Sequence, residues 1–316
     1  MSAVAPGGER SDGCRCWICG SIDTMRWKDG TLERPVSSED LRITDARYGV
    51  TLALRRCPDC GFIFAEDHDL ERLDELYAQL SDPGYEESQR PRSLQMRWLV
   101  VSALRAVPGA ATALDVGAGS GLLVREAERA GLDAVGIEPS LHLVETGIRD
   151  HGVDLLQGVL PHPALQDRRF DLVFLVDVIE HVARPVELLA ACAGVLDAHG
   201  LLVVVTPDVS SLPARLLRRR WWHMRVAHVG YFNRSSLTLA ARRAALEPVG
   251  WDRARWFFEV GYLADRVGAY LPVGALNRRI RRWGDVARLY DRVIRVNLYD
   301  SSVVFLRHRG CDPATR

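Results

Sequence analysis

Three glycines and two carboxylates in the middle of the chain form a pattern typical of a nucleotide-binding site. Asp115 lies in an apolar run, the glycines follow it, and a second apolar run ends at Glu138. Glycines in such a turn let a ligand approach the backbone, and the later carboxylate binds ribose hydroxyls. A dinucleotide site needs the spacing G-x-G-x-x-G, but Leu122 stands at the position of its third glycine. The spacing here is G-x-G-x-G, and its glycines are Gly117, Gly119 and Gly121.

A second pattern, near the start of the chain, is typical of a metal site. Two C-x-x-C-G motifs contain Cys16 with Cys19 and Cys57 with Cys60. Four thiolates in two such turns bind zinc tetrahedrally and leave no open position, which makes the ion structural. The alternative is four free thiols, and nothing in the motifs indicates the exposed, acidic pair that a redox role needs. We treat Cys14 as a bystander, although it could replace Cys16 as a ligand.

The elements that must position these residues alternate in type. Strands are expected over 112–117, 133–138, 153–157, 170–176 and 200–206, and helices over 120–130, 140–150 and 185–196. Such alternation predicts a parallel sheet with helices on both faces. Ligands bind these sheets at the carboxyl ends of the strands, which is where Asp115, Gly117, Glu138, Gln157 and Asp177 fall.

Further elements are expected on both sides of this alternating region. Apolar spacing predicts helices over 70–80, 94–107 and 237–246, with the last one starting near Ser235-Ser236. A strand is expected over 251–258, a basic helical stretch over 262–296, and a final strand over 303–306.

The glycine motif and the segments after it resemble the class I S-adenosylmethionine (SAM) methyltransferases. The stretch 114–121 resembles motif I, 170–182 resembles the fourth strand with the helix entry after it, and 196–207 resembles the fifth strand. The likeness covers residues 95–260. It implies an α/β fold with a Rossmann-like, doubly wound, seven-stranded sheet, and similar four-cysteine modules precede SAM domains in methyltransferases of sugars and other small metabolites.

The resemblance also implies a division of the chain. We expect a disordered tail over 1–13, a zinc-binding module over 14–66, a methyltransferase domain over 67–310 and a tail over 311–316. A helical substrate lid is expected within the catalytic domain, at about 208–235 and 260–297.

For the cofactor, the resemblance implies SAM with contacts along the strand ends. Asp115 would orient the ligand ammonium, Glu138 would accept the ribose hydroxyls, and Pro139 would border the adenine. Many relatives place an Asp after the glycine that follows the third strand, but this chain has Val159. Adenine recognition is therefore left to backbone groups or Gln157. The expected cofactor residues are Asp115, Gly117, Ala118, Gly119, Gly121, Glu138, Pro139, Gln157, Gly158, Asp177 and Val178.

Three residues are candidates for the chemistry of methyl transfer. His181 follows the fourth strand, and a near-neutral pKa would suit it to deprotonate an alcohol or phenol. Its alternative role is to brace the loop through a hydrogen bond. His228 and Tyr231 are rivals in a segment that folds over the substrate in similar enzymes, and their alternative role is packing. Tyr77 and Tyr85 could close the cofactor pocket or be ordinary aromatics.

These patterns favour transfer of a methyl group to O or C of a small molecule, such as a sugar nucleotide or another secondary metabolite, with SAM and structural zinc. The formal net charge of zero makes a nucleic-acid partner unlikely, and the polar first 13 residues favour a cytoplasmic location. One alternative is an RNA methyltransferase that contacts RNA through the zinc module and the arginines in 215–225 and 278–282. A non-catalytic SAM- and zinc-binding module is another. A membrane-bound 262–296 stretch is possible but less favoured than a solvated lid.

Overall fold

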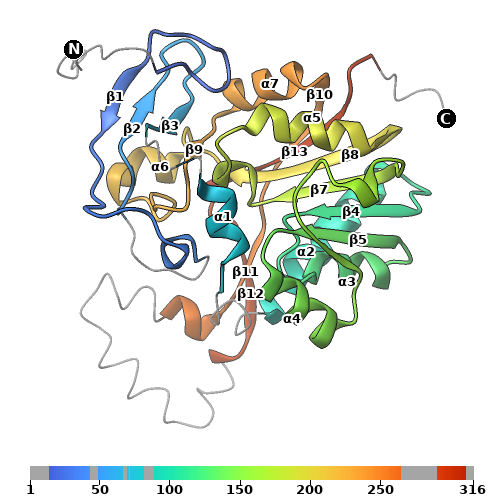
Figure 1. Ribbon diagram of the computed structural model, residues 1–316. Helices are drawn as coiled ribbons and strands as arrows, with labels where there is room; N and C mark the ends of the chain where they lie inside the picture. Colours follow the sequence, from blue (N-terminus) through green and yellow to red (C-terminus); the bar gives the residue numbers. More distant parts are fainter. Residues whose placement is uncertain are drawn as a thin grey trace.

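A seven-stranded sheet forms the centre of the molecule (Figure 1). The computed structural model describes residues 14–42, 49–66, 70, 72–81, 89–264 and 290–310. Five strands are parallel, and β13 is antiparallel to its neighbours β8 and β10. Across the sheet the order is β10 (Leu246–Arg253), β13 (Ser301–His308), β8 (Leu196–Pro207), β7 (Phe170–Val176), β4 (Thr112–Val116), β5 (Asp133–Glu138) and β6 (Leu155–Gln157).

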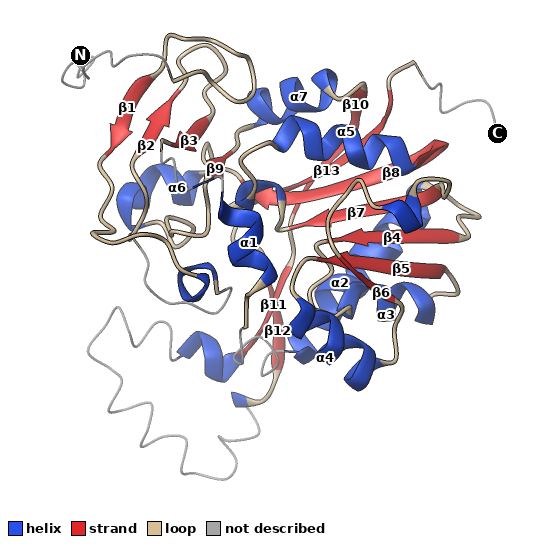
Figure 2. Cartoon of the chain, viewed as in Figure 1, coloured by secondary structure: helices blue, strands red, loops and turns tan. Residues whose placement is uncertain are grey.

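Helices cover both faces of the sheet, as the alternating sequence predicts (Figure 2). One face carries α5 (Pro185–Val195) and α7 (Arg234–Arg243). The other face carries α2 (Gln89–Ala106), α3 (Leu122–Arg129) and α4 (Leu141–His151). Within the described residues, no helix is both long enough and apolar enough to cross a membrane.

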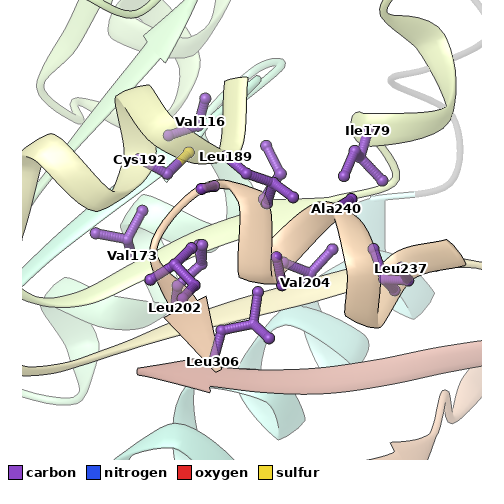
Figure 3. Close-up of a cluster of buried hydrophobic side chains, with 14 of the residues drawn as sticks. Val116, Val173, Ile179, Leu189, Cys192, Leu202, Val204, Leu237, Ala240 and Leu306 are labelled. Carbon is purple, nitrogen blue, oxygen red and sulfur yellow. The ribbon is translucent and has the colours of Figure 1, made fainter. Parts of the chain in front are cut away.

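Alternation along the central strands divides the core into two layers. In β7, Val173 and Leu175 belong to the layer under α5 and α7, whereas Leu172 and Phe174 belong to the layer under α2 and α3. Successive strand residues point to opposite faces, so a strand buried on both sides is apolar throughout. Figure 3 shows α5 and α7 side chains over sheet residues from β4, β7, β8 and β13.

The N-terminal cysteine segment contributes three strands to a second sheet, and a fourth strand comes from a segment after β8. Its strands are β1 (Met25–Lys28), β2 (Leu54–Arg56) and β3 (Ile63–Ala65), with a short 3-10 helix at Ser38–Leu41. The fourth strand, β9 (Gly230–Tyr231), pairs antiparallel with β3 and places Tyr231 opposite Ile63. Before β9 come α6 (Leu212–Leu217) and a 3-10 turn at Arg218–Arg220, while α1 (Leu73–Ala78) follows the module.

Two predictions about the C-terminal part were wrong. The single strand expected over 251–258 is two strands, β10 and β11 (Trp256–Glu259). The stretch expected to be helical up to 296 ends instead in β12 (Val293–Val296), which pairs with β11. The run of β-branched residues in β12 fits a pleated strand better than a helix. Helix α7 also starts earlier than expected, since Asn233 is its N-cap.

Several expectations lie outside the described residues. These are the tails 1–13 and 311–316, Tyr85, and most of the second lid segment with its arginines at 278–282.

Candidate active site

A tight glycine loop joins β4 to α3 at the carboxyl edge of the sheet. Gly117, Gly119 and Gly121 have φ values of 74°, 55° and 75°, which only glycine adopts without strain. A Cβ on Gly117 would lie 2.5 Å from Cγ2 of Val178, so the loop packs directly against the segment after β7. The backbone N–H groups of Gly117 and Ala118 both donate to the Ile137 carbonyl, at 2.8 and 3.1 Å.

Glu138 ties this loop to the end of β5. Its Oε2 accepts from the N–H of Gly119 and its Oε1 from the N–H of Ser140, both at 2.9 Å. The side chain is 6% exposed, and burial raises the pKa of Glu138 while these two N–H groups oppose the rise. The carboxylate is therefore fixed in position by the backbone that it faces.

Two more carboxyl groups lie at neighbouring strand ends without such partners. Burial and the nearby Glu138 raise the pKa of Asp115 to about 8, and burial raises the pKa of Asp177 to about 6. Asp177 also has a positive φ of 53°. Neither carboxyl group makes a hydrogen bond to the described part of the chain. Three acids around one loop make this edge of the sheet suited to a ligand with a positive charge.

The remaining predicted cofactor residues lie along the same edge. Pro139 is half-buried after β5, Gln157 is exposed at the end of β6, and the Gly158 N–H donates to the Glu138 carbonyl at 2.9 Å. Val159, at the position where the resemblance predicts an acid, is 51% exposed. The structure thus brings all eleven candidates to the ends of four adjacent strands.

Beyond β7, aromatic and titratable side chains form a second group, which we call the histidine cluster: Tyr77, Glu180, His181, His223 and His228. Tyr77 Oη lies 2.8 Å from Nδ1 of His181, which is also 2.8 Å from the Ala227 carbonyl. The His228 ring stands edge-on to His181, with centroids 4.8 Å apart. Glu180 accepts from the Thr206 hydroxyl at 2.9 Å.

Metal-ligating atom types meet in this cluster, because donor atoms of Glu180, His181 and His228 lie within 4.8 Å of one another. Hydrogen bonds already engage Glu180 and His181, so we interpret the trio as a polar binding surface rather than a metal centre. Glu180 Oε1 and His228 Nδ1 are buried without a hydrogen-bond partner. Buried polar atoms of this kind are usually satisfied by water or a ligand.

The electrostatics differ from those expected of a near-neutral catalytic histidine. Burial and the nearby Arg225 lower the pKa of His181 to about 3, and burial holds the pKa of His228 well below its usual range. Both rings are therefore neutral at pH 7. Tyr231 is 1% exposed, its pKa is raised by burial, and its hydroxyl donates to the Arg225 carbonyl at 3.4 Å.

Sequence reasoning missed the residues that complete this cluster from the far end of the chain. Asp300, just before β13, is fully buried. Its Oδ2 accepts from Trp222 Nε1 at 2.7 Å and lies 3.1 Å from Nε2 of His223. The available signals were the run Trp221-Trp222-His223 and an acid at the start of the final strand, and neither has a diagnostic spacing.

Comparison with known proteins agrees with the fold and the loop. A family model described as a methyltransferase domain matches residues 68–249. This chain belongs to the methyltransferase domain family. The strand order also confirms the predicted Rossmann-like class I sheet.

The curated relatives of this methyltransferase-domain protein are matched only in part. A ubiquinone biosynthesis O-methyltransferase from Azorhizobium caulinodans is 35% identical over 101 residues, which are 29% of this chain and 39% of that protein. One from Cereibacter sphaeroides is 30% identical over 151 residues, which are 43% of this chain and 60% of that protein. The chain therefore spans less than two thirds of the length of these relatives.

Among solved structures, the complex between the Haloferax volcanii Trm112 methyltransferase activator and the putative methyltransferase gives a TM-score of 0.51. It is 15% identical and covers 75% of this chain and 97% of that one. At this identity the likeness concerns the fold alone.

The four paired cysteines of this methyltransferase-domain protein also converge, as predicted. Their sulfur atoms lie within 4.8 Å of one another, with Cys16 to Cys60 at 3.6 Å and Cys19 to Cys57 at 3.4 Å. A tetrahedral zinc with Zn–S bonds near 2.3 Å would place its sulfurs about 3.8 Å apart, so the cluster fits that ion. Burial raises the pKa of Cys57 to about 11, which opposes full ionisation without a cation. Cys14 lies outside the cluster.

Proposed function

We propose that this protein is a SAM-dependent methyltransferase that acts on a hydroxyl oxygen of a small molecule, such as a sugar nucleotide or another secondary metabolite. The observation that carries the proposal is the glycine loop fastened to Glu138 beside the unpartnered Asp115. Oxygen is favoured over carbon because the curated relatives are named O-methyltransferases.

SAM would supply a methyl group on a sulfonium, which is already a good leaving group. Asp115 would accept from the ligand ammonium, and Glu138 would turn part of its hydrogen-bonding capacity toward the ribose hydroxyls. Asp177 and Val178 would border the methionine end. The raised pKa values of Asp115 and Asp177 reflect buried acids that lack a cation, and SAM carries that charge.

The histidine cluster would bind the acceptor. The neutral rings of His181 and His228 accept hydrogen bonds, and Glu180 Oε1 offers a further buried polar atom. Uncharged hydroxyl groups match these partners better than anions do, since buried neutral rings and a carboxyl offer an anion little stabilisation. Tyr231 would act structurally, because its hydroxyl is already engaged.

We assign the cysteines to structural zinc, held by Cys16, Cys19, Cys57 and Cys60. A closed all-sulfur site contributes to folding and leaves no position for substrate. We also propose that the module spans 14–66 and the catalytic domain 67–310, with the strand pair β3–β9 joining them.

Calorimetric titration with SAM and S-adenosylhomocysteine tests the cofactor assignment, using protein with a measured zinc content. We expect micromolar binding of both ligands. Glu138→Ala should weaken the affinity for both about 100-fold, since the charge-assisted hydrogen bonds from the two ribose hydroxyls to Glu138 disappear. Glu145→Ala, an exposed glutamate on α4, is the matched control. Tritium transfer from SAM to a panel of hydroxylated acceptors then identifies the substrate class. Absence of SAM binding by folded, zinc-loaded protein would overturn the proposal.

A further inference from the structure

Asp300 and His223 form a buried carboxylate–imidazole pair that links the start of β13 to the segment before β9. Asp300 is fully buried. Its Oδ2 accepts a hydrogen bond from the Trp222 N–H and lies within hydrogen-bond distance of Nε2 of His223. A carboxylate only accepts hydrogen bonds, so a neutral His223 carries its proton on Nε2. The lone pair then lies on Nδ1, for which the described residues provide no hydrogen-bond partner.

We propose that His223 is the general base for the acceptor hydroxyl and that Asp300 is the residue that positions it. This inference rests on the proposed function and deepens it. Asp300 fixes the tautomer and orientation of the ring and stabilises the imidazolium once it forms, as a carboxylate does in other carboxylate–imidazole pairs. The side chain of His223 retains 15% exposure, which leaves it accessible to substrate and solvent.

His223 suits this role better than the two histidines beside it. The rings of His181 and His228 make no hydrogen bond to a carboxylate in the described chain, and burial lowers the pKa of both. A base must hold the proton that it removes, and their charged forms are disfavoured. His223 stacks on His228 with centroids 5.5 Å apart, so it belongs to the same cluster while pairing with Asp300.

Proton transfer to His223 and methyl transfer from SAM would occur in one step. The acceptor hydroxyl transfers its proton to Nδ1 of His223 as its oxygen forms a bond to the methyl carbon. The carbon–sulfur bond breaks and its electron pair stays on sulfur, which becomes the neutral thioether. The imidazolium beside Asp300 then releases the proton to solvent.

Charged and titratable groups surround His223 from several elements. Asp300 precedes β13, Asp177 follows β7, and Arg225 and His228 lie on its own segment. His181, in the turn after β7, is close enough for the charge of His223 to lower the pKa of His181.

The first test needs no acceptor. Long-range nitrogen–proton NMR of histidine-labelled protein should show neutral His223 protonated on Nε2, with His223→Gln used to assign the signal. In Asp300→Asn the amide can donate to the ring, so the proton should move to Nδ1. A wild-type signal protonated on Nδ1, or no change in Asp300→Asn, would overturn the proposal.

The second test uses tritium transfer to the acceptor found in the screen. We expect kcat to fall about 10²- to 10⁴-fold in His223→Gln, with SAM affinity unchanged by calorimetry. The remaining rate should rise steadily with pH, because hydroxide replaces the base. His142→Gln, an exposed histidine on α4, should retain the wild-type rate. A wild-type pH profile in His223→Gln would refute the base role, and intact SAM binding would leave the proposed function standing.

Discussion

The two sides of the candidate site are built in different ways. The glycine-loop side consists of residues 115–139 on adjacent parallel strands, held by backbone hydrogen bonds and Glu138. The histidine cluster draws Tyr77, Glu180, His181, His223 and His228 from three separate stretches of chain. It depends on Asp300 and on β9, which pairs with the cysteine module. Distant perturbations should therefore disturb the histidine cluster while sparing the glycine loop.

Loss of the metal site should have the largest effect, and it should destabilise the histidine cluster but not the glycine loop. We expect Cys60→Ser to lose zinc and unfold the N-terminal sheet, because a structural zinc contributes about 10–16 kcal/mol, comparable to a whole domain's stability. Hydrogen exchange should then accelerate at 226–232, where the Val229 N–H donates to the backbone carbonyl of Glu180 and β9 pairs with β3. Residues 113–118 should keep their protection.

Two further measurements complete this test. SAM affinity should change by no more than about threefold in Cys60→Ser, since the hydrogen bonds that hold the glycine loop come from Ile137 and Glu138, outside the module. Cys14→Ser should bind one zinc and exchange like the wild type. Equal loss of protection on both sides would show that the site is one cooperative unit.

Gly117→Ala should instead damage the glycine-loop side. The alanine would have to adopt a φ of 74°, and its Cβ would lie 2.5 Å from Cγ2 of Val178. Left-handed strain and overpacking together should lower the free energy of unfolding by about 2–4 kcal/mol and weaken SAM binding. Gly152→Ala is a matched control, because its φ is 67° but no atom lies within 4 Å of the added Cβ. Urea unfolding should show a loss of only about 1 kcal/mol there.

The buried Asp115 should make stability depend on pH. Its folded pKa of about 8 exceeds its ordinary value of 3.8, so above pH 4 the unfolded state ionises while the folded state stays protonated. Stability should therefore fall as pH rises from 4 to 8. Asp115→Asn should remove part of this slope and stabilise the ligand-free protein at pH 8 by about 2–4 kcal/mol. The exposed Asp167→Asn should leave urea-unfolding curves at pH 5 and pH 8 unchanged, and an unaltered slope in Asp115→Asn would contradict the buried charge.

The same contrast explains what the sequence could predict. The glycine loop and the strands around it follow from local spacing, because neighbouring parallel strands bring their carboxyl ends together automatically. Asp300 and His223 are 77 residues apart, and no periodicity relates them. Their contact depends on where the last strand enters the sheet. The near-neutral pKa expected for His181 was wrong for a related reason, since burial of the ring and repulsion from the Arg225 charge both depend on the tertiary structure.

Asn233 should give the smallest effect, and it links α7 of the catalytic domain to the cysteine module. Its side-chain oxygen accepts from Ser236 N–H at 2.9 Å as the N-cap of α7, and its Nδ2 donates to the Cys60 carbonyl at 3.3 Å. Asn233→Ala removes both bonds and should lower the free energy of unfolding by about 1–2 kcal/mol. Asn233→Asp retains the cap but loses the donor to Cys60.

Zinc release to a chromophoric chelator distinguishes the role of Asn233 as the N-cap of α7 from its hydrogen bond to the Cys60 carbonyl. Both Asn233 variants should release zinc faster than the wild type, because the knuckle loses its tie to α7. Ser211→Ala, which removes only the cap of α6 over Ala214, should cost a similar fraction of stability and leave zinc release unchanged. If Ser211→Ala accelerated release as much, general destabilisation rather than the Asn233–Cys60 contact would govern the metal site. The histidine cluster would then depend on the catalytic domain's own stability and not on the docked module.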